Sequence, residues 1–455
     1  MILIPKKGYN EIKYDSELAK KLDYVIIVND VDSSNVGDLF SIWNQKCKVT
    51  ICNDITDYYD FIKKEKKLNH KTNIMIIGTK NTSYETILEY KSLTSFYLFY
   101  KSEVKKIEKE MSKWNKTFIN KKDNILVKDA MNKFVFMNSN GKYLRALLIA
   151  LGYLISTKKD DLSYLPLAAA YETFQTSILI HDDVIDNSEL RRGKKTVHKK
   201  YEEKFDKYDL KDALFEEKKK NTTSSIGICL GDIGFYIANN IIVENYMNNP
   251  NLARLLKYYN NIVINTGKGE LIDVVLPFNE KYNSKNKCLE KDIMEIYELK
   301  TSWYTIIGPC SLGLILGGSS ERVVDSIVKS LSPIGIAFQI KDDLLGIYGN
   351  IKSLGKSNTS DITEYKQTIL YSYVVNGTEY KDELKKYYGN ADLSEKDYLK
   401  IRDIFEKSGA KKYAIDMMNS LFSESKKLIL KNRNIPTYYK EILLGLIIYL
   451  EIRDN

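Results

Sequence analysis

Two long apolar stretches of this chain each carry a pair of aspartates near their carboxyl ends, and this pattern constrains the fold most. Residues 165–185 contain Asp182-Asp183 near their end, and residues 324–345 contain Asp342-Asp343. Apolar residues at helical spacing predict helices in both stretches. Acids near the ends of apolar helices are accommodated when the helices face each other across a polar cavity. The pattern therefore predicts a helical bundle with an acidic site inside it.

The spacing of the first acidic motif indicates what the site binds. Asp182 and Asp186 are four residues apart, which places both carboxylates on one face of a helix, where they repel each other unless a cation lies between them. Arg191 and Arg192 follow directly. Mg²⁺ prefers oxygen ligands and often binds together with substrate phosphates. A solvated helix end explains either aspartate pair alone equally well, but two pairs and an arginine pair together favour a site for Mg²⁺ and diphosphate.

The chain divides into a small α/β segment at residues 1–100 and an all-α segment at residues 101–455. Apolar strands alternate with helices in the first segment, which predicts a parallel sheet. The strands are expected at 24–28, 48–52 and 73–78, and the helices at 36–46, 55–67 and 83–92. No phosphate-binding glycine loop is evident there. A nucleotide-binding or receiver-like role is one interpretation, and a structural or oligomerisation appendage is the favoured one.

The second segment reads as helical nearly throughout. Helices are expected at 144–155, 165–185, 226–245, 293–316 and 324–345, with interruptions at Pro309 and Pro333. The charge-rich residues 202–222 are expected to form a loop or an exposed helical insertion. The predicted fold is mainly α: an all-α bundle preceded by a small α/β domain.

Further motifs follow in a fixed order along the second segment. They are Gly141-Lys142-Tyr143-Leu144-Arg145, Gln175, Lys300-Thr301, Gln339, Lys356 and Lys366. Together with the two acidic motifs and the arginine pair, this order resembles the trans-isoprenyl diphosphate synthases, the family of farnesyl, geranylgeranyl and polyprenyl diphosphate synthases. The resemblance covers roughly residues 105–455, and it implies that the predicted all-α bundle is of the isoprenoid-synthase type.

The resemblance implies an activity and a role for each matching residue. The activity is a Mg²⁺-dependent head-to-tail condensation of isopentenyl diphosphate with an allylic diphosphate. The residues implied to bind isopentenyl diphosphate are Lys142, Arg145, Gln175 and Arg192. Those implied to hold the allylic diphosphate are Arg191, Lys300, Lys356 and Lys366, with Mg²⁺ on Asp182, Asp186 and Asp342. The implied catalytic set is Asp182, Asp183, Asp186, Lys300, Thr301, Gln339 and Asp342, in which Thr301 and Gln339 offer oxygen dipoles to the allylic cation. A homodimer is also implied.

One position departs from the family pattern. The second motif is usually Asp-Asp-x-x-Asp, whereas this chain has Gly346 at the fifth position. An aspartate there would share a helix face with Asp342, so its absence weakens one metal site. We interpret the glycine as a trait of a subgroup, and a helix C-cap is a second explanation for it.

Product length is suggested by the residues that precede Asp182. Ile178 and Ser177 lie about one turn before it, and Phe174 lies one turn deeper. The resemblance implies that aromatic residues at the nearer level stop the chain at farnesyl. Because Ser177 is small, the product is expected to be geranylgeranyl or longer, with Phe174 as the floor of the tunnel.

Composition excludes several other classes of function. The five cysteines show no paired spacing, which argues against a zinc site or a disulfide framework. The net charge of +9 is spread along the chain, so the lysine runs are better explained as solvated faces than as a nucleic-acid site. We expect no apolar stretch to reach the roughly 20 residues needed to span a bilayer. A cytoplasmic enzyme without a transmembrane segment is therefore expected.

Three functions remain open at this level. The first is an active prenyl-chain elongating enzyme. The second is a class I terpene cyclase, which also ionises diphosphates but needs no isopentenyl diphosphate site. The third is a non-catalytic subunit of a heteromeric synthase, which loss of the acidic motifs would favour. The intact Lys142, Arg145 and arginine-pair positions favour the first.

Overall fold

The structure, a computed structural model, describes residues 2–3, 21–28, 47–69, 71–78, 82–139, 141–159, 161–209, 211–283, 288–349, 360–390 and 392–453. The helix predicted at residues 36–46 and the side chain of Lys356 lie outside these residues. The chain forms two compact units. The first comprises Met1–Lys105 and Ile429–Arg453, and the second comprises Lys106–Leu428 with the last two residues.

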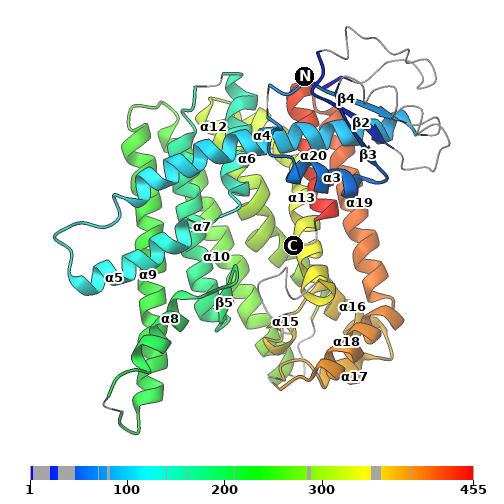
Figure 1. Cartoon of the computed structure of the whole chain (residues 1–455). Helices are drawn as coiled ribbons and strands as arrows, with labels where there is room; N and C mark the ends of the chain where they lie inside the picture. The colour runs from blue at the N-terminus through cyan, green and yellow to red at the C-terminus, as the bar shows by residue number, and fades with distance from the viewer. Residues whose placement is uncertain are drawn as a thin grey trace. The chain divides into compact units, whose positions relative to one another are not determined.

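The first unit is built on a four-stranded parallel sheet with the strand order β1-β4-β2-β3 (Figure 1). The strands are β1 (Ile2–Leu3), β2 (Tyr24–Val28), β3 (Lys48–Cys52) and β4 (Ile74–Gly78). All five residues of β2 are buried, as expected for an inner strand of a parallel sheet. The predicted parallel sheet is confirmed.

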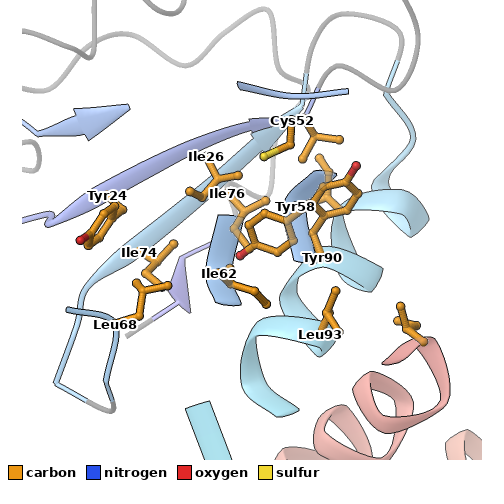
Figure 2. Packing of buried hydrophobic residues seen from close by; sticks show 13 residues of the cluster. Tyr24, Ile26, Cys52, Tyr58, Ile62, Leu68, Ile74, Ile76, Tyr90 and Leu93 are labelled. Atoms are coloured by element: carbon orange, nitrogen blue, oxygen red, sulfur yellow. The ribbon is translucent and has the colours of Figure 1, made fainter. Parts of the chain in front are cut away.

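Helices pack on this sheet around an aromatic and aliphatic core (Figure 2). They are α3 (Ile55–Lys64), the first part of α4 (Tyr84–Asn115) and α20 (Thr437–Ile452). The rings of Tyr58 and Tyr90 lie 4.9 Å apart, and Ile448 of α20 joins the same cluster. The sequence pattern predicted a single division near residue 100, whereas the last helix belongs to the first unit.

The second unit contains helices throughout and one short hairpin, which agrees with the mainly α prediction. Its elements are the rest of α4, α5 (Ile125–Asn138), α6 (Leu144–Thr157), α7 (Leu165–Ile185), β5 (Leu190–Arg191), β6 (Lys194–Lys195), α8 (Val197–Phe205), α9 (Phe215–Tyr246), α10 (Leu252–Tyr282), α11 (Glu290–Ile296), the π-helix η2 (Tyr297–Ile307), α12 (Gly308–Leu316), α13 (Glu321–Tyr348), α15 (Ser360–Thr363), α16 (Ile369–Gly377), α17 (Lys381–Lys385), α18 (Glu395–Lys407) and most of α19 (Ala410–Lys431).

Several boundaries differ from those expected. Helix α9 begins at Phe215, earlier than the predicted residue 226, so the last part of the 202–222 segment is helical, one of the two structures expected for it. Pro333 lies inside α13 without ending it, and Pro309 lies in the first turn of α12, which follows directly from the π-helix η2. Gly346 lies inside α13, which Gly349 caps, so the C-cap explanation for Gly346 is wrong.

Close packing of α7 against α9 sets the position of the first acidic motif. A Cβ at Gly231 of α9 would lie 2.1 Å from Nε2 of His181, and one at Gly227 would lie 2.5 Å from the Val184 side chain. The glycines leave room for the last turn of α7, which ends beside its two aspartates. The small residues of α9 therefore support the end of the helix that bears the motif.

Two of the described helices, α9 and α13, are long and apolar enough to cross a bilayer by length and composition alone. Core helices of water-soluble proteins pass the same test. Helix α9 packs against α7 and α8, and α13 packs against η2. Charged residues interrupt both helices, so neither stands out in the sequence as a continuous apolar run.

We expect Gly231→Ala to destabilise the protein. Its Cβ collides with the His181 ring, and such overpacking costs about 1–3 kcal/mol. This cost exceeds the gain of about 1 kcal/mol from alanine's higher helix propensity. Gly267→Ala is the matched control, because no atom lies within 4 Å of its added Cβ and α10 should gain stability. Urea unfolding of both variants measures the difference, and a Gly231→Ala protein as stable as the Gly267→Ala protein would contradict the packing argument.

Candidate functional site

A cavity of about 370 Å³ in the second unit gathers most of the candidate residues. Its walls come from α6, α7, the β5–β6 hairpin, α10, η2, α13 and the segment around α15. The predicted site residues that line it are Arg145, Ile178, Asp182, Arg191, Lys300, Thr301, Gln339, Asp342 and Lys366. Lys142, Phe174, Gln175, Ser177, Asp183, Asp186 and Arg192 are described but are not among its lining residues. The two acidic motifs thus contribute to one cavity.

The first acidic motif is held by Arg191. Its Nη2 donates to Asp182 Oδ2 at 2.6 Å, and its Nε donates to Asp183 Oδ1 at 2.7 Å. Burial lowers the pKa of Arg191, but the two carboxylates outweigh this effect and raise the pKa above its usual value. The guanidinium therefore stays charged and fixes the end of α7.

The turn of the β5–β6 hairpin separates the two arginines. Arg191 is the last residue of β5, where it pairs with Lys194. Arg192 and Gly193 form the turn with φ of +54° and +70°, the left-handed conformation that a two-residue hairpin turn needs at both positions. Consequently Arg191 lies against the acids, whereas Arg192 is exposed.

Lys300 connects the first motif with a set of acids that the sequence motifs do not include. Its Nζ lies 2.6 Å from Asp273 Oδ2, 2.8 Å from Glu270 Oε2 and 3.5 Å from Asp182 Oδ1. Burial lowers the pKa of Lys300, but these carboxylates raise it well above its usual value. Glu270 and Asp273 are three residues apart on α10. This spacing puts both acids on one helix face, and it is the feature of the sequence that could have indicated them as site residues.

The π-helix η2 presents Lys300 and Thr301 to the cavity. Wide π turns are rare and occur often at functional sites. Helix α10 approaches this turn closely, since a Cβ at Gly269 would lie 2.5 Å from the backbone nitrogen of Lys300. The sequence pattern predicted one helix over 293–316 and gave no sign of the π-helix.

The second acidic motif divides its two aspartates between the cavity and a buried network. Asp342 lines the cavity. The carboxyl of Asp343 accepts from the Tyr297 hydroxyl and from Gln339 Nε2, the latter at 2.8 Å, while Thr301 Oγ1 donates to Gln339 Oε1 at 2.6 Å. Burial raises the pKa of Asp343 to about 8. Asp343 and Tyr297, which were not among the predicted site residues, therefore position Gln339 and, through it, Thr301.

Lys366 links the first acidic motif with the segment that follows α13. Its Nζ lies 3.0 Å from Asp186 Oδ2 and 3.5 Å from Glu364 Oε2. Burial lowers its pKa, but the carboxylates, led by Asp186, raise it well above the usual value. Asp186 itself is the C-cap of α7, one residue past the helix.

Arg145 belongs to a second group of interacting residues in the site. It donates to Thr305 Oγ1 at 2.9 Å, and its guanidinium carbon lies 4.0 Å from the centre of the Tyr304 ring. With the Gln175 amide oxygen turned toward it, Arg145 Nη1 donates to Gln175 at 2.8 Å. In this orientation the amide nitrogen of Gln175 donates to Glu172 Oε2 at 2.8 Å.

Glu172 is a buried carboxylate that the sequence motifs also leave out. Its Oε1 accepts the Ala146 amide at 2.9 Å, so it ties the start of α6 to α7. Burial raises the pKa of its carboxyl, and Arg145 opposes that effect. A single acid in the apolar run 165–181 was the signal, because an unpaired acid is too costly to bury.

The three residues predicted to control chain length lie in different environments. Ile178 lines the cavity. Ser177 is fully buried against α9, where a Cβ at Gly234 would lie 2.1 Å from its Oγ. Phe174 is also buried and meets the Tyr304 ring at 6.1 Å between centroids. Tyr304 lines the cavity, so it lies between the cavity and Phe174.

The charge balance of the cavity bears on which ligand it accepts. Five aspartates and four cationic side chains line it, and Asp186, Glu270 and Glu364 add carboxylates bound to those cations. Within the described residues no three acid, histidine or cysteine side chains form a ready metal cage. Oxygen donors in excess, without a closed cage, suit Mg²⁺, which binds through one or two carboxylates and completes its shell with phosphates and water.

The chain is similar to known proteins over most of the second unit. The family model described as polyprenyl synthetase matches residues 126–405. A short chain isoprenyl diphosphate synthase of Methanocaldococcus jannaschii is 29% identical over 290 residues, which cover 64% of this chain and 76% of that protein. A geranylgeranyl diphosphate synthase of Sulfolobus acidocaldarius is 28% identical over 63% of this chain and 82% of that protein.

A solved structure agrees with these sequence matches. The geranylgeranyl pyrophosphate synthase of Corynebacterium glutamicum, in complex with isoprenyl diphosphate and magnesium, aligns with a TM-score of 0.70 and 25% identity. The alignment covers 77% of this chain and 98% of that one.

We expect Lys300→Met to destabilise the protein by about 2–3 kcal/mol at pH 7.5, toward the low end for a broken buried ion pair, because it leaves half-buried acids without their cation. The raised pKa of Lys300 means that its contribution is fully present below pH 10 and is lost only as the pH rises further. The deficit should shrink toward pH 5, since burial raises the pKa of Glu270 and lets it take up a proton.

The matched control for this variant is Lys268→Met, an exposed lysine on α10. Thermal unfolding from pH 5 to pH 8 compares the two proteins. Equal midpoints for both variants at every pH would show that the Lys300 ion pairs contribute no stability.

Proposed function

The chain belongs to the polyprenyl synthetase family and is a prenyltransferase of the isoprenyl diphosphate synthase type, and on this premise we propose the reaction that it catalyses. The enzyme condenses isopentenyl diphosphate head to tail with an allylic diphosphate, depends on Mg²⁺, and releases a linear trans-prenyl diphosphate. One observation carries the proposal: aspartates of both acidic motifs and the cations Arg191, Lys300 and Lys366 line the same cavity.

The cation requirement follows from the charges. A diphosphate would be repelled by the excess of carboxylates around the cavity unless divalent cations accompanied it. The residues proposed to hold Mg²⁺ are Asp182, Asp186 and Asp342. When bound, the metal supplies Lewis-acid stabilisation of the diphosphate leaving group. Magnesium accompanies isoprenyl diphosphate in the similar Corynebacterium glutamicum enzyme, which supports this choice of metal.

The cationic side chains of the cavity are proposed to hold the allylic diphosphate. Arg191, Lys300 and Lys366 now pair with acids, and they can turn the same donors toward phosphate oxygens. Positive groups fixed in advance stabilise the negative charge that grows on diphosphate as the C–O bond breaks. Lys356 is assigned the same role by its place in the sequence alone.

The remaining polar groups of the cavity are proposed to act on the allylic cation and the second substrate. Thr301 and Gln339 present oxygen dipoles to the cation, and their geometry is fixed by Asp343 and Tyr297. Lys142, Arg145, Gln175 and Arg192 are proposed to bind isopentenyl diphosphate. Its double bond attacks the cation, a carbon–carbon bond forms, and the proton lost afterwards passes to the released diphosphate.

The enzyme is proposed to act as a homodimer in the cytoplasm. Helices α9 and α10 expose large apolar side chains, including Tyr236 at 76%, Leu271 at 65% and Phe278 at 66%. Exposed apolar side chains of this kind mark protein interfaces when they are contiguous, and a second copy of the chain is the partner that the family resemblance implies. Analytical ultracentrifugation of the full chain measures the assembly state.

The proposed reaction is tested with purified protein, Mg²⁺, labelled isopentenyl diphosphate, and dimethylallyl, geranyl or farnesyl diphosphate in turn. Linear prenols after phosphatase treatment are expected. Asp182→Asn and Asp342→Asn should each lower kcat about 100-fold or more, whereas Asp382→Asn on the exposed helix α17 should not. Cyclic hydrocarbons without incorporation of isopentenyl diphosphate would identify a terpene cyclase instead, and complete inertness would favour a non-catalytic subunit.

The product is proposed to be geranylgeranyl diphosphate or longer. Among the three chain-length candidates only Ile178 lines the cavity, so it is the residue to change. We expect Ile178→Phe to shorten the main product by at least one isoprene unit, because the larger side chain fills space needed by the tail. Ile178→Leu conserves volume and serves as the control. Unchanged product lengths in the Phe variant would assign the tunnel floor to another helix.

A further inference from the structure

A buried cluster outside the cavity surrounds the carboxylate of Glu280. Glu280 lies in the last turn of α10 and is 8% exposed. Its Oε2 accepts hydrogen bonds from the hydroxyls of Tyr365 at 2.5 Å and Tyr371 at 3.1 Å, and its Oε1 accepts one from Lys385. Burial raises the pKa of Glu280, but these donors outweigh that effect and hold the pKa below its usual value. The carboxylate is therefore charged, although neither it nor the two tyrosines line the cavity.

Tyr365 has a backbone conformation that is rare for a tyrosine. Its φ is +59°, in the left-handed region. A residue other than glycine stays in this region only where its surroundings hold it. The centre of the Tyr365 ring lies 5.8 Å from the ring centres of both Tyr371 and Tyr388, and its hydroxyl is bound to Glu280. The cluster therefore holds both the ring and the hydroxyl in place.

The chain that follows α17 packs against the same ring. Gly389 has a φ of +74°, and its amide donates to the Ile362 carbonyl at 2.8 Å. A Cβ at Gly389 would lie 2.9 Å from Cδ2 of Tyr365. This backbone approaches the ring as closely as a glycine allows, so the Tyr365 ring has little room to move.

The residue after Tyr365 is Lys366, whose side chain lines the cavity. Its Nζ lies 3.0 Å from Asp186 Oδ2. Tyr365 is only 9% exposed and belongs to the cluster, so two consecutive side chains reach different places. A lysine carries its charge on a long and flexible stem. The direction in which Lys366 leaves the backbone therefore depends on the left-handed turn at Tyr365.

We propose that Glu280 is a positioning residue of the diphosphate site: by binding the Tyr365 hydroxyl, it fixes the turn that directs Lys366 into the cavity. The inference rests on the proposed function, in which Lys366 holds the allylic diphosphate. Glu280 and Tyr365 touch no substrate and act through Lys366. The cluster is the reason that this cation is in place before the ligand binds, which is what electrostatic stabilisation of a leaving diphosphate requires.

Tyr365→Phe tests the proposal, because it removes the hydroxyl and keeps the ring. Calorimetry measures the binding of inorganic pyrophosphate with Mg²⁺ to the full chain, and circular dichroism establishes that each variant is folded. We expect Tyr365→Phe to weaken the binding about threefold to tenfold, the range for the loss of one hydrogen bond. Glu280→Ala should weaken it at least as much, and Tyr365→Phe decides the matter if that variant does not fold.

Tyr373→Phe is the matched control. It removes a hydroxyl from α16, the helix that also carries Tyr371, but its ring packs on Tyr413 outside the cluster. This variant should bind pyrophosphate as the wild type does.

A double variant separates positioning from a general loss of stability. Lys366→Met alone should weaken pyrophosphate binding about tenfold or more, because it removes a charged donor. Since Tyr365 acts through Lys366, adding Tyr365→Phe to Lys366→Met should cause no further weakening. Turnover gives a second readout: Tyr365→Phe should raise the KM for the allylic diphosphate and leave the KM for isopentenyl diphosphate unchanged.

The outcomes separate this inference from the proposed function. If the wild type binds pyrophosphate with Mg²⁺ and folded Tyr365→Phe binds it equally tightly, the positioning role is overturned and the proposed function stands. If Tyr365→Phe weakens binding by the same factor with and without Lys366, the hydroxyl does not act through Lys366, and the positioning role is again overturned. If the wild type itself does not bind pyrophosphate with Mg²⁺, both the inference and the proposed function fail.

Discussion

The rest of the site depends on the balance of charge around one cavity. Carboxylates from α7, α10, α13 and the α15 segment surround Lys300, Lys366 and Arg191. Each of these cations is half-buried, and each has its pKa raised by its acidic partners. Mutual attraction offsets the cost of burying the charges. The same groups are then available to a ligand that brings both anionic oxygens and divalent cations.

Backbone packing gives this charge cluster its geometry. Helix α9 approaches the end of α7 at Gly231, and α10 approaches the π-helix at Gly269. Both approaches are too close for a larger side chain, so the glycines fix where the first motif and Lys300 lie. A second network, from Asp343 to Thr301, orients the neutral oxygens of the cavity. The charged and the neutral parts of the site share η2 and α13, but different contacts position them.

The sequence predicted much of the fold and the larger part of the cavity lining. Apolar periodicity gave the parallel sheet and the helical bundle, because these patterns reflect local burial. It failed at the π-helix and at the start of α9, where tertiary contacts override local preference. It also missed Glu172, Glu270 and Asp273, which form no motif with their neighbours and matter only through distant partners.

The amino-acid sequence by itself determined which helices carry acids, the spacing within each acidic motif, and the resemblance to the prenyl synthases. These features depend on residues within a few turns of one another. Only the tertiary structure decided which charges meet. Arg145 donates a hydrogen bond to Thr305, 160 residues away in the sequence, and Lys366 donates one to Asp186, 180 residues away. It also brought Asp361 to the space beside Gly346. Such contacts arise from helix packing, which local spacing does not specify.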